Sequence, residues 1–554
     1  MRKLFILFIF YYLTFALAAQ EYLTGVGSNP LKQEHSKTME WQTTLKSQFI
    51  ATPSVNLPFF DDFSQITIYP DTSRWIDNEA FINSTFPYYP VNYGVATLDV
   101  LDAKGFVYPW ATPYTFLADR LTSKPIRLDS VFDPSIQTMK LLSPADSVYF
   151  SFYYQPQGRG DSPLKHDSLV LEFGYFNADT VFSHMEYAEV FGFDYLNPGE
   201  PYLMPFSIIQ PPFGCDTSMW HILTDTLFYD ESIMIPCDSV FQFGTDWTFV
   251  WGAEGDSLNT FIDKHGVFFK YVLIPIEDPD FFRHDFQFRF KNYASISNIN
   301  SWKSNTDQWH IDVVRLDWKR SVKDQFRQEI SFVEDPQGFI VDYTSMPYNQ
   351  YSGNITGLKR ESIDMYVHNL DSVNRNVYYN YYVQNAQGDT LPAFLTEGFT
   401  GLLNTHFDQN IFEYQPFVKP PVKYFFTSAS QDTADFRITH VVRDVDDPSM
   451  GDTIVYQQEF RNYFAYDDGS AEAGYGLSPA GAKLAVKFRT EEVDTLRGVK
   501  MYFNKTFGNY NNRLFHISVW SDNNGVPGNL IYSMNNVRPV FSDQFNQFHT
   551  YEFP

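Results

Sequence analysis

"DSVYFSFYYQ", from Asp146 to Gln155, is the stretch that decides the fold. After an Asp-Ser pair, most of its residues are aromatic or apolar. A second run, "DSLVLEFGYF" from Asp167 to Phe176, opens in the same way and has the same character. Aromatic and β-branched side chains favour the pleated surface of a strand, whereas Asp and Ser favour the turn before it. Each run therefore predicts a β-strand.

The connection between these two strands is "GRGDSP", from Gly158 to Pro163. Gly and Pro are typical turn residues, so we expect a hairpin that joins the two strands. The same letters contain Arg-Gly-Asp, the tripeptide that integrins read. A match of three residues inside a Gly-rich turn has little specificity, and the interpretation as a turn is favoured.

A tripeptide of Asp, then Ser or Thr, then Val, Leu or Ile recurs along the chain. Its Asp and Ser/Thr side chains bond locally to the backbone of a turn, and the third residue enters a strand. Examples of the tripeptide start at Asp146, Asp167, Asp179, Asp225, Asp238, Asp256, Asp371, Asp389, Asp452 and Asp494. Because helical periodicity is nearly absent, the predicted class is all-β, with tandem β-sandwiches.

The chain is too long for one core. At 554 residues it suggests two to four domains, and its 18% of aromatic residues suit half-buried strands. We expect a signal peptide at 1–18, a polar lead-in at 19–56, a sandwich at 57–320, an immunoglobulin-like sandwich at 321–416, a proline linker with connecting strands at 417–461, and an incomplete sandwich at 462–554. The net charge of −26 argues against nucleic acid, because a phosphate backbone needs clustered Lys and Arg.

The N-terminus has the pattern of an export signal. Arg2 and Lys3 precede an uncharged apolar run from Leu4 to Leu17, and Ala16-Leu17-Ala18 is a small-x-small cleavage site. The run is shorter than the roughly 20 residues of a membrane helix, and no other stretch comes near that length. We therefore expect cleavage near Ala18, no transmembrane span, and a protein that is secreted or displayed on the outer cell surface.

Two cysteines, Cys215 and Cys237, are the only ones in the chain. In an oxidising compartment a disulfide is the favoured interpretation, worth about 3 kcal/mol through loop entropy. The alternative is a pair of buried thiols.

Two strand patterns suggest where sandwiches close and open. In "DQWHIDVVRLDWKR", from Asp307 to Arg320, the alternation predicts that Trp309, Ile311, Val313 and Arg315 share one face of a closing strand. In "SIDMYVHNL", from Ser362 to Leu370, alternate residues Ile363, Met365 and Val367 point inward. We expect this strand to pair with the strand at Val377 across an Asp-Ser turn, as in an immunoglobulin-like domain.

Two Asp-Asp pairs follow aromatic residues: Asp61-Asp62 in "PFFDDFSQ" and Asp467-Asp468 in "NYFAYDDGS". Adjacent carboxylates suit a hard cation such as calcium. A true calcium loop, however, spaces its acids at alternate positions and has Gly at a sharp turn, and neither stretch does so. The favoured interpretation is that each pair caps a turn where a new domain begins.

The span from "PFFDDFSQ" to "WHIDVVRL" resembles concanavalin-A-like or MAM-like jelly rolls. The chain as a whole is similar to surface proteins of Bacteroidota that are exported by the type IX secretion system. Motifs that carry this likeness are "YPDTSRWID" (69–77), "GVATLDVLDAKG" (94–105), "YTSMPYNQY" (343–351), "FAYDDGSAEAGYGL" (464–477) and "VWSDNNGVPG" (519–528). The family's C-terminal sorting domain is missing, so we expect a truncated chain.

The resemblance also implies a possible calcium site. In a MAM-like arrangement, Asp312 of the closing strand would approach Asp61 or Asp62, and a shared ion would be structural. Calcium is the only cofactor for which the sequence gives a reason.

The sequence gives no catalytic pattern. The acids of "HMEYAEVFGFD" (184–194) lie at the wrong intervals for one strand face, the histidines lack metal-ligand spacing, and no nucleophile motif occurs. Exposed aromatic rings are the remaining candidates for ligand contact, by stacking on a sugar or a protein partner. Those candidates are Trp247, Trp251 and Trp302.

The expected function is therefore non-catalytic binding or adhesion, with a glycan or a surface protein as ligand and the type IX machinery as export partner. One alternative is a carbohydrate-active enzyme whose acids come from separate strands. The other is a structural stalk without a ligand.

Overall fold

The computed structural model describes most of the chain from residue 20 onward. The described residues are 20–24, 28–38, 54–191, 202–203, 226–227, 232–296, 307–391, 398–408, 415–428, 433–467, 474–478, 481–503, 512–541 and 548–554. Strands dominate them, the helices are short, and the sheets are antiparallel, so the all-β prediction is confirmed. The predicted signal peptide lies outside the described residues.

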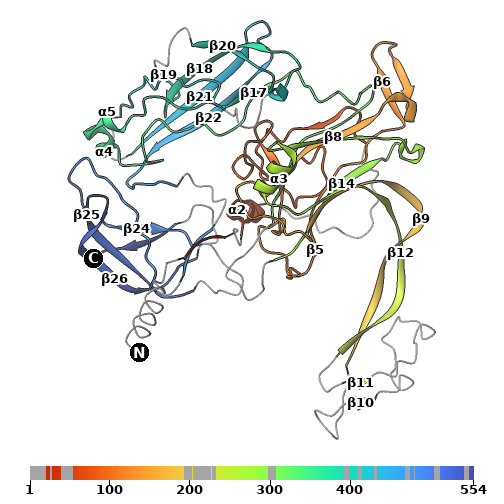
Figure 1. Cartoon of the computed structure of the whole chain (residues 1–554), viewed down its shortest axis with the longest axis horizontal. Helices are drawn as coiled ribbons and strands as arrows, with labels where there is room; N and C mark the ends of the chain where they lie inside the picture. Colours follow the sequence, from red (N-terminus) through yellow and green to blue (C-terminus); the bar gives the residue numbers. More distant parts are fainter. Residues whose placement is uncertain are drawn as a thin grey trace, which may run out of the picture.

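The first sandwich packs a six-stranded sheet against a four-stranded one (Figure 1). The larger sheet has the order β13 (Lys270–Pro275), β8 (Tyr149–Pro156), β15 (Trp309–Asp317), β4 (Val95–Leu98) and β3 (Phe81–Asn83), with β2 (Phe59–Asp61) also on β15. The smaller has the order β12 (Ser232–Glu254), β9 (Ser168–Phe191), β14 (Gln287–Ala294) and β5 (Phe116–Thr122).

Aromatic rings fill the space between the two sheets. The buried ring of Trp75 stacks on Phe63 and makes edge contacts with Phe59 and Phe288, at centroid separations of 5.3 to 5.9 Å. Its indole N–H donates to Asp61 at 2.6 Å, which satisfies the polar atom of an otherwise apolar ring. The aromatic richness of the sequence is thus explained largely by this core.

The two strands that the opening stretch predicts are both present, but they do not form a hairpin. β8 belongs to the six-stranded sheet and β9 to the four-stranded sheet. Phe150 of β8 meets Phe173 of β9 across the core at 5.5 Å between ring centroids. The connection crosses from one layer to the other, because both strands bury rings that must face each other.

The closing strand β15 also departs from the predicted alternation. Trp309 and Ile311 lie in the core as expected, but a β-bulge between Asp312 and Arg315 shifts the phase. Val314 and Leu316 therefore point inward, and Val313 and Arg315 line the outer face. Val313 has a φ of 46°, a strained value for a β-branched residue, and it is the position at which the phase changes.

A long hairpin arm leaves the first sandwich. Figure 1 shows β9 and β12 continuing together well beyond the other strands of their sheet. Only Ser168–Gly174 of β9 pairs with β14, whereas β12 accompanies β9 along most of its length. Two further short strands, β10 (Tyr202–Leu203) and β11 (Thr226–Leu227), pair with each other beyond this arm.

Shorter elements complete this part of the chain. They are β1 (Gln20–Thr24), α2 (Pro30–Thr38), β6 (Ser130–Asp133), β7 (Thr138–Leu141), η1 (Pro144–Asp146), α3 (Leu258–His265) and η4 (Pro279–Phe281). Helix α2 is anchored by Lys32, whose buried ammonium donates to the carbonyls of Glu79, Leu101 and Asp102. Helix α2 is thereby fixed on the first sandwich.

The second sandwich has a five-stranded sheet and a two-stranded one. The larger contains β19 (Thr390–Leu391), β18 (Arg375–Asn385), β21 (Ala434–Asp444), β22 (Gly451–Phe460) and β20 (Phe399–Leu403). The smaller pairs β16 (Ile330–Phe332) with β17 (Val367–Asn369). Helices α4 (Tyr348–Gly353) and α5 (Ile355–Leu358) and the turn η5 (His406–Asp408) lie outside the sheets.

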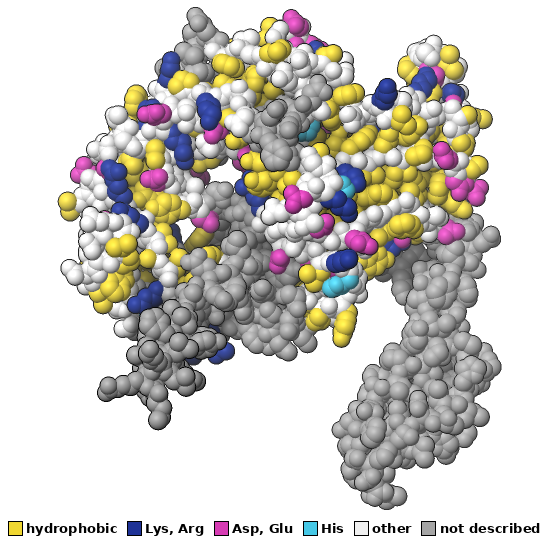
Figure 2. All heavy atoms as spheres, viewed as in Figure 1, with side chains coloured by type: hydrophobic (Ala, Val, Ile, Leu, Met, Phe, Trp, Pro, Cys, Tyr) yellow, Lys and Arg dark blue, Asp and Glu magenta, His cyan; other side chains and the backbone are white. Residues whose placement is uncertain are grey.

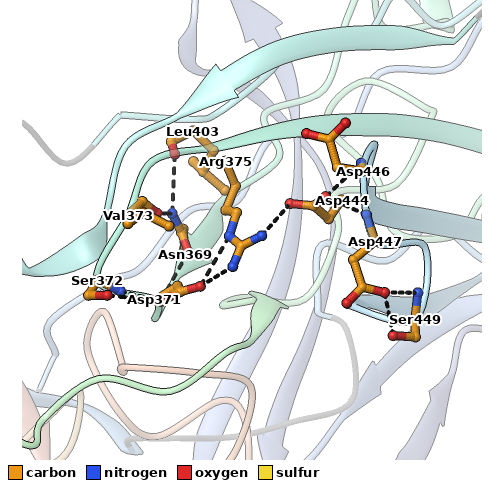
Figure 3. A network of polar contacts seen from close by, with 10 residues as sticks. All are labelled: Asn369, Asp371, Ser372, Val373, Arg375, Leu403, Asp444, Asp446, Asp447 and Ser449. Carbon is orange, nitrogen blue, oxygen red and sulfur yellow. Dashed lines mark hydrogen bonds and ion pairs between the residues drawn. The ribbon is translucent and has the colours of Figure 1, made fainter.

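The predicted inward residues Ile363, Met365 and Val367 are buried, but their strand does not pair with β18. The Asp-Ser turn at Asp371 carries the chain from one sheet to the other (Figure 3). Asp371 accepts from the Ser372 N–H at 2.6 Å, and it is bonded by Arg375, which also reaches Asp444 at 3.6 Å. Arg375 thereby links this turn between the layers to the end of β21.

Residues 417–424, expected to be the proline linker of the 417–461 region, instead pack on the second core. Val418, Val422 and Phe426 are buried among the residues of that core, and β21 and β22 extend its sheet. The prolines keep this segment extended, and its apolar side chains pack inward. The second sandwich therefore runs to about residue 460.

The remaining strands are β23 (Gly474–Ser478), β24 (Gly498–Met501), β25 (Phe515–Asn523), β26 (Val526–Val537) and β27 (His549–Glu552). They form pairs, β24 with β27 and β25 with β26, and β23 pairs with β1. Tyr343 of the second sandwich accepts from the Arg489 N–H at 2.7 Å and stacks on Phe488. This last part is thereby packed on the second sandwich.

The two sandwiches are joined by a polar and aromatic interface. Arg159 pairs with Glu334 at 3.3 Å, and Tyr93 donates to Asp335 at 2.6 Å. His368 Nδ1 lies 2.9 Å from the carbonyl oxygen of Val91, and His406 packs against His368 at 4.1 Å between ring centroids. The His368 ring is buried and the His406 ring is partly buried against it, so the contact favours neutral imidazoles.

We predict that acid weakens this structure through the histidine pair. Burial lowers the pKa of His368 to about 4, and burial together with His368 lowers the pKa of His406 well below 6.5. A histidine whose pKa is lowered on folding stabilises the protein above its unfolded pKa, and that stability is lost as the pH falls below about 6.5. Each unit by which the pKa differs between the folded and unfolded states corresponds to about 1.4 kcal/mol in the free energy of unfolding.

Urea unfolding at pH 7.5 and pH 5.0 measures this effect. His406→Phe removes one of the two groups and should reduce the loss of stability at pH 5.0 by at least about 1 kcal/mol. His284→Gln, at an exposed position, is the control and should leave the loss unchanged. Equal losses in the wild type and His406→Phe would refute the prediction.

Candidate functional site

The acids of the first Asp-Asp pair have separate partners. Asp61 accepts from Trp75 and from the Phe63 N–H at 3.1 Å. Asp62 accepts from the N–H and the hydroxyl of Ser64, at 3.2 and 2.8 Å, and pairs with Arg327 at 2.9 Å. These contacts fit the turn-capping interpretation, and Arg327 supplies a positive charge to Asp62 from within the protein.

Asp312 is fully buried and bound mainly by nitrogen donors. It accepts from the N–H groups of Val91 and Asn92 at 3.2 and 3.4 Å, and the Asn92 amide nitrogen, turned toward it, lies 2.8 Å away. Burial, and secondly the charge of Asp62, raise the pKa of Asp312 well above its usual value. Among the described residues, no group of three or more His, Cys, Asp or Glu side chains is placed to hold a metal ion.

The structure describes only part of the second Asp-Asp pair and of the predicted disulfide. Asp467 is exposed, and its carbonyl oxygen accepts from the Thr344 hydroxyl. Asp468 and Cys215 lie outside the described residues, as does the side chain of Cys237 in β12. The Cys215–Cys237 disulfide stays a prediction.

The three candidate tryptophans have different positions. Trp251 packs inward, with edge contacts to Phe152 and Tyr154 at 5.0 and 4.9 Å, so it belongs to the core. Trp302 lies outside the described residues. Trp247 is half-buried on β12, opposite Gly174 of β9, and is the candidate that the outer face of the four-stranded sheet presents.

Two glycines let aromatic rings lie close to this sheet face. A Cβ at Gly174 would come within 2.7 Å of the Trp247 ring, and a Cβ at Gly252 would come within 3.3 Å of the Phe249 ring. Trp247 therefore covers the backbone of the neighbouring strand, and Phe249, with 63% of its surface exposed, lies beside it. Glycine is needed at 174 because any side chain would displace the indole.

A charged network lies next to these rings on the same face. Glu172 is bonded by Arg289 at 2.6 Å and by Lys291 at 2.7 Å. The Arg289 guanidinium lies 4.0 Å from the centre of the Trp247 ring, and the Lys291 ammonium lies 5.1 Å from that of Tyr293. Each cation thus has a carboxylate on one side and an aromatic ring on the other, which holds its side chain in place.

We call Trp247, Phe249, Glu172, Arg289 and Lys291 the aromatic platform. Its strands are the last part of β12, the first part of β9, and β14, which are hydrogen-bonded in that order. Chemically the platform offers ring faces for stacking and fixed polar groups beside them. That combination suits a ligand with apolar faces and many hydroxyl groups.

Four of the five platform residues were missed by the sequence reasoning. A signal existed in "QFRFKNYA" (287–294), where the polar residues Gln287, Arg289 and Lys291 alternate with Phe288 and Phe290. Alternation places them on one outer face, but it does not show which strands lie beside them. That pairing comes only from the fold.

Comparison with protein-family models finds no match, and comparison with curated proteins finds none either. Within the described part of the chain, none of the helices has the length and apolar character needed to cross a bilayer. The face drawn in Figure 2 shows hydrophobic side chains gathered over the first sandwich, with acidic and basic groups interspersed.

We predict that Gly174→Ala disturbs the platform. The new methyl group would meet the Asp246 carbonyl oxygen at 2.6 Å as well as the Trp247 ring, so the two strands or the indole must shift. Overpacking of this kind costs about 1–3 kcal/mol, which urea unfolding measures. Gly252→Ala, whose nearest contact would be 3.3 Å, is the matched control and should cost less. Equal stability of the two variants would contradict the prediction.

Proposed function

We propose that this protein is an exported, non-catalytic binding protein whose first sandwich takes a glycan on the aromatic platform. The observation that carries the proposal is the Trp247 ring held over Gly174 beside the Glu172–Arg289 pair. A flat ring next to fixed hydrogen-bonding groups can contact both the C–H face and the hydroxyl groups of a sugar. A binding role in adhesion to a glycan-bearing surface follows from it.

The exposed Phe249 ring supports the proposal further. A large ring with 63% of its surface in water lies beside Trp247, so a ligand would extend over two rings. Burial of such apolar area stabilises a complex by about 25 cal/mol per Å² before the cost of association. Hydrogen bonds from the nearby Glu172, Arg289 and Lys291 would orient the ligand.

Export also belongs to this proposal. The N-terminal pattern of residues 1–18 and the resemblance to type IX secretion substrates are its basis, with the outer surface or the medium as the destination. The type IX machinery would be the export partner of a chain that carries the sorting domain.

The proposal is tested with a glycan array and the exported chain. We predict that Trp247→Ala lowers the retention of any bound glycan by roughly 30-fold, the effect of losing a central aromatic contact of about 2 kcal/mol. Phe249→Ala should weaken it less, because that ring lies nearer the solvent. Trp110→Ala, at a ring that is 55% exposed elsewhere on the sandwich, is the control and should have no effect.

Other outcomes separate the alternatives. Release of reducing sugar that is lost on a single Glu or Asp substitution would make the protein an enzyme. Binding of a protein but of no glycan would change the ligand class. No ligand at all, with folded variants, would favour a structural stalk.

A further inference from the structure

A groove of about 440 Å³ lies on the other side of the first sandwich from the aromatic platform. Its floor is the outer face of the six-stranded sheet, and its opposite wall is the segment 324–328 that leads to the second sandwich. The bulge in β15 turns Arg315 toward it. Groups that line the groove include Phe60, Tyr153, Tyr271, Arg315, Arg320 and Arg327.

The acids of the groove are already bonded within the protein. Asp324 is shared by Arg315 and Arg320, at 3.4 and 2.8 Å, and Asp317 is bonded by Arg315 at 3.2 Å. Arg320 is nearly fully buried, and its nitrogens bond to Asp324, to carbonyl oxygens and to the Tyr271 hydroxyl. Arg320 therefore holds the wall together.

Two other arginines, Arg315 and Arg327, do not use all of their N–H donors in these ion pairs. Arg315 reaches its acids through its two terminal nitrogens, and Arg327 reaches Asp62 and Glu329 through a single one. Arg327 also lies 3.7 Å from the centre of the Phe60 ring, which fixes its plane. An arginine has five N–H donors, so donors of both residues are available to a ligand.

Tyr153 gives an independent indication. Its side chain lines the groove and is nearly fully buried, and its hydroxyl group has no hydrogen-bond partner. Leaving a buried hydroxyl unpaired costs about 1–3 kcal/mol, so such a group calls for a partner. A ligand oxygen at the base of the groove would supply one.

We propose that this groove binds a carboxylate group of a small ligand, between Arg315 and Arg327 and with Tyr153 as a further donor. The surplus of donors favours a ligand that only accepts, and the planar guanidiniums match the planar carboxylate. Sugar acids and acidic amino acids both carry this group. The proposal is independent of the aromatic platform.

Isothermal titration of the full chain with D-glucuronate and with N-acetyl-glutamate tests it, with acetamide as the neutral control. We expect binding of at least one acid and none of acetamide. If glucuronate alone binds, the source is a sugar acid, and if N-acetyl-glutamate alone binds, the source is an acidic amino acid. No heat with either acid, from a chain that is folded by circular dichroism, would overturn the proposal.

Two variants separate a ligand role from a structural one. Tyr153→Phe removes an unpaired hydroxyl group, so its thermal stability without ligand should equal or exceed that of the wild type, while its affinity for the acid falls about 5- to 10-fold. Arg315→Gln should lower the affinity more. Trp110→Ala, at an exposed ring that does not line the groove, should leave binding of the acid unchanged. Unaltered affinity in both groove variants would refute the assignment.

Discussion

The contact between the two sandwiches depends on the buried carboxyl group of Asp312, which holds the segment 91–93 in place. It binds the backbone N–H groups of Val91 and Asn92, which belong to no strand. The same short segment offers the Val91 carbonyl to His368 and the Tyr93 hydroxyl to Asp335. One enclosed acid thus positions the contacts through which the second sandwich meets the first. Its raised pKa is the result of placing it where no water can solvate a charge.

The all-β class follows from the sequence because the alternation of apolar and polar residues along a strand is a local property. The inward positions Ile363, Met365 and Val367 and the strands at Tyr149 and Ser168 were predicted from alternation and turn chemistry alone. Which strands pair is not local. The chain changes layers after β8 and again at Asp371, and the same turn residues serve a hairpin and an arch equally well.

The departures from expectation at β15 and at 417–424 have related causes. A bulge inserts one residue into a strand and reverses every later side chain, and nothing in the letters "HIDVVRL" marks Val313 as the point of reversal. Prolines are typical of an extended linker, but extended backbone also suits a segment that packs on a core. Of the candidate site, Trp247 was predicted, because a tryptophan is conspicuous. Its neighbours come from three strands that only the folded sheet brings together.

The hairpin arm of β9 and β12 has a mechanical consequence. Its strands are continuous with the four-stranded sheet, so tension on the arm would travel along the strand axes directly into the sandwich (Figure 1). The hydrogen bonds between Ser168–Gly174 and β14 lie across that axis. They would be loaded in shear, and many would have to break together before the arm could be pulled out.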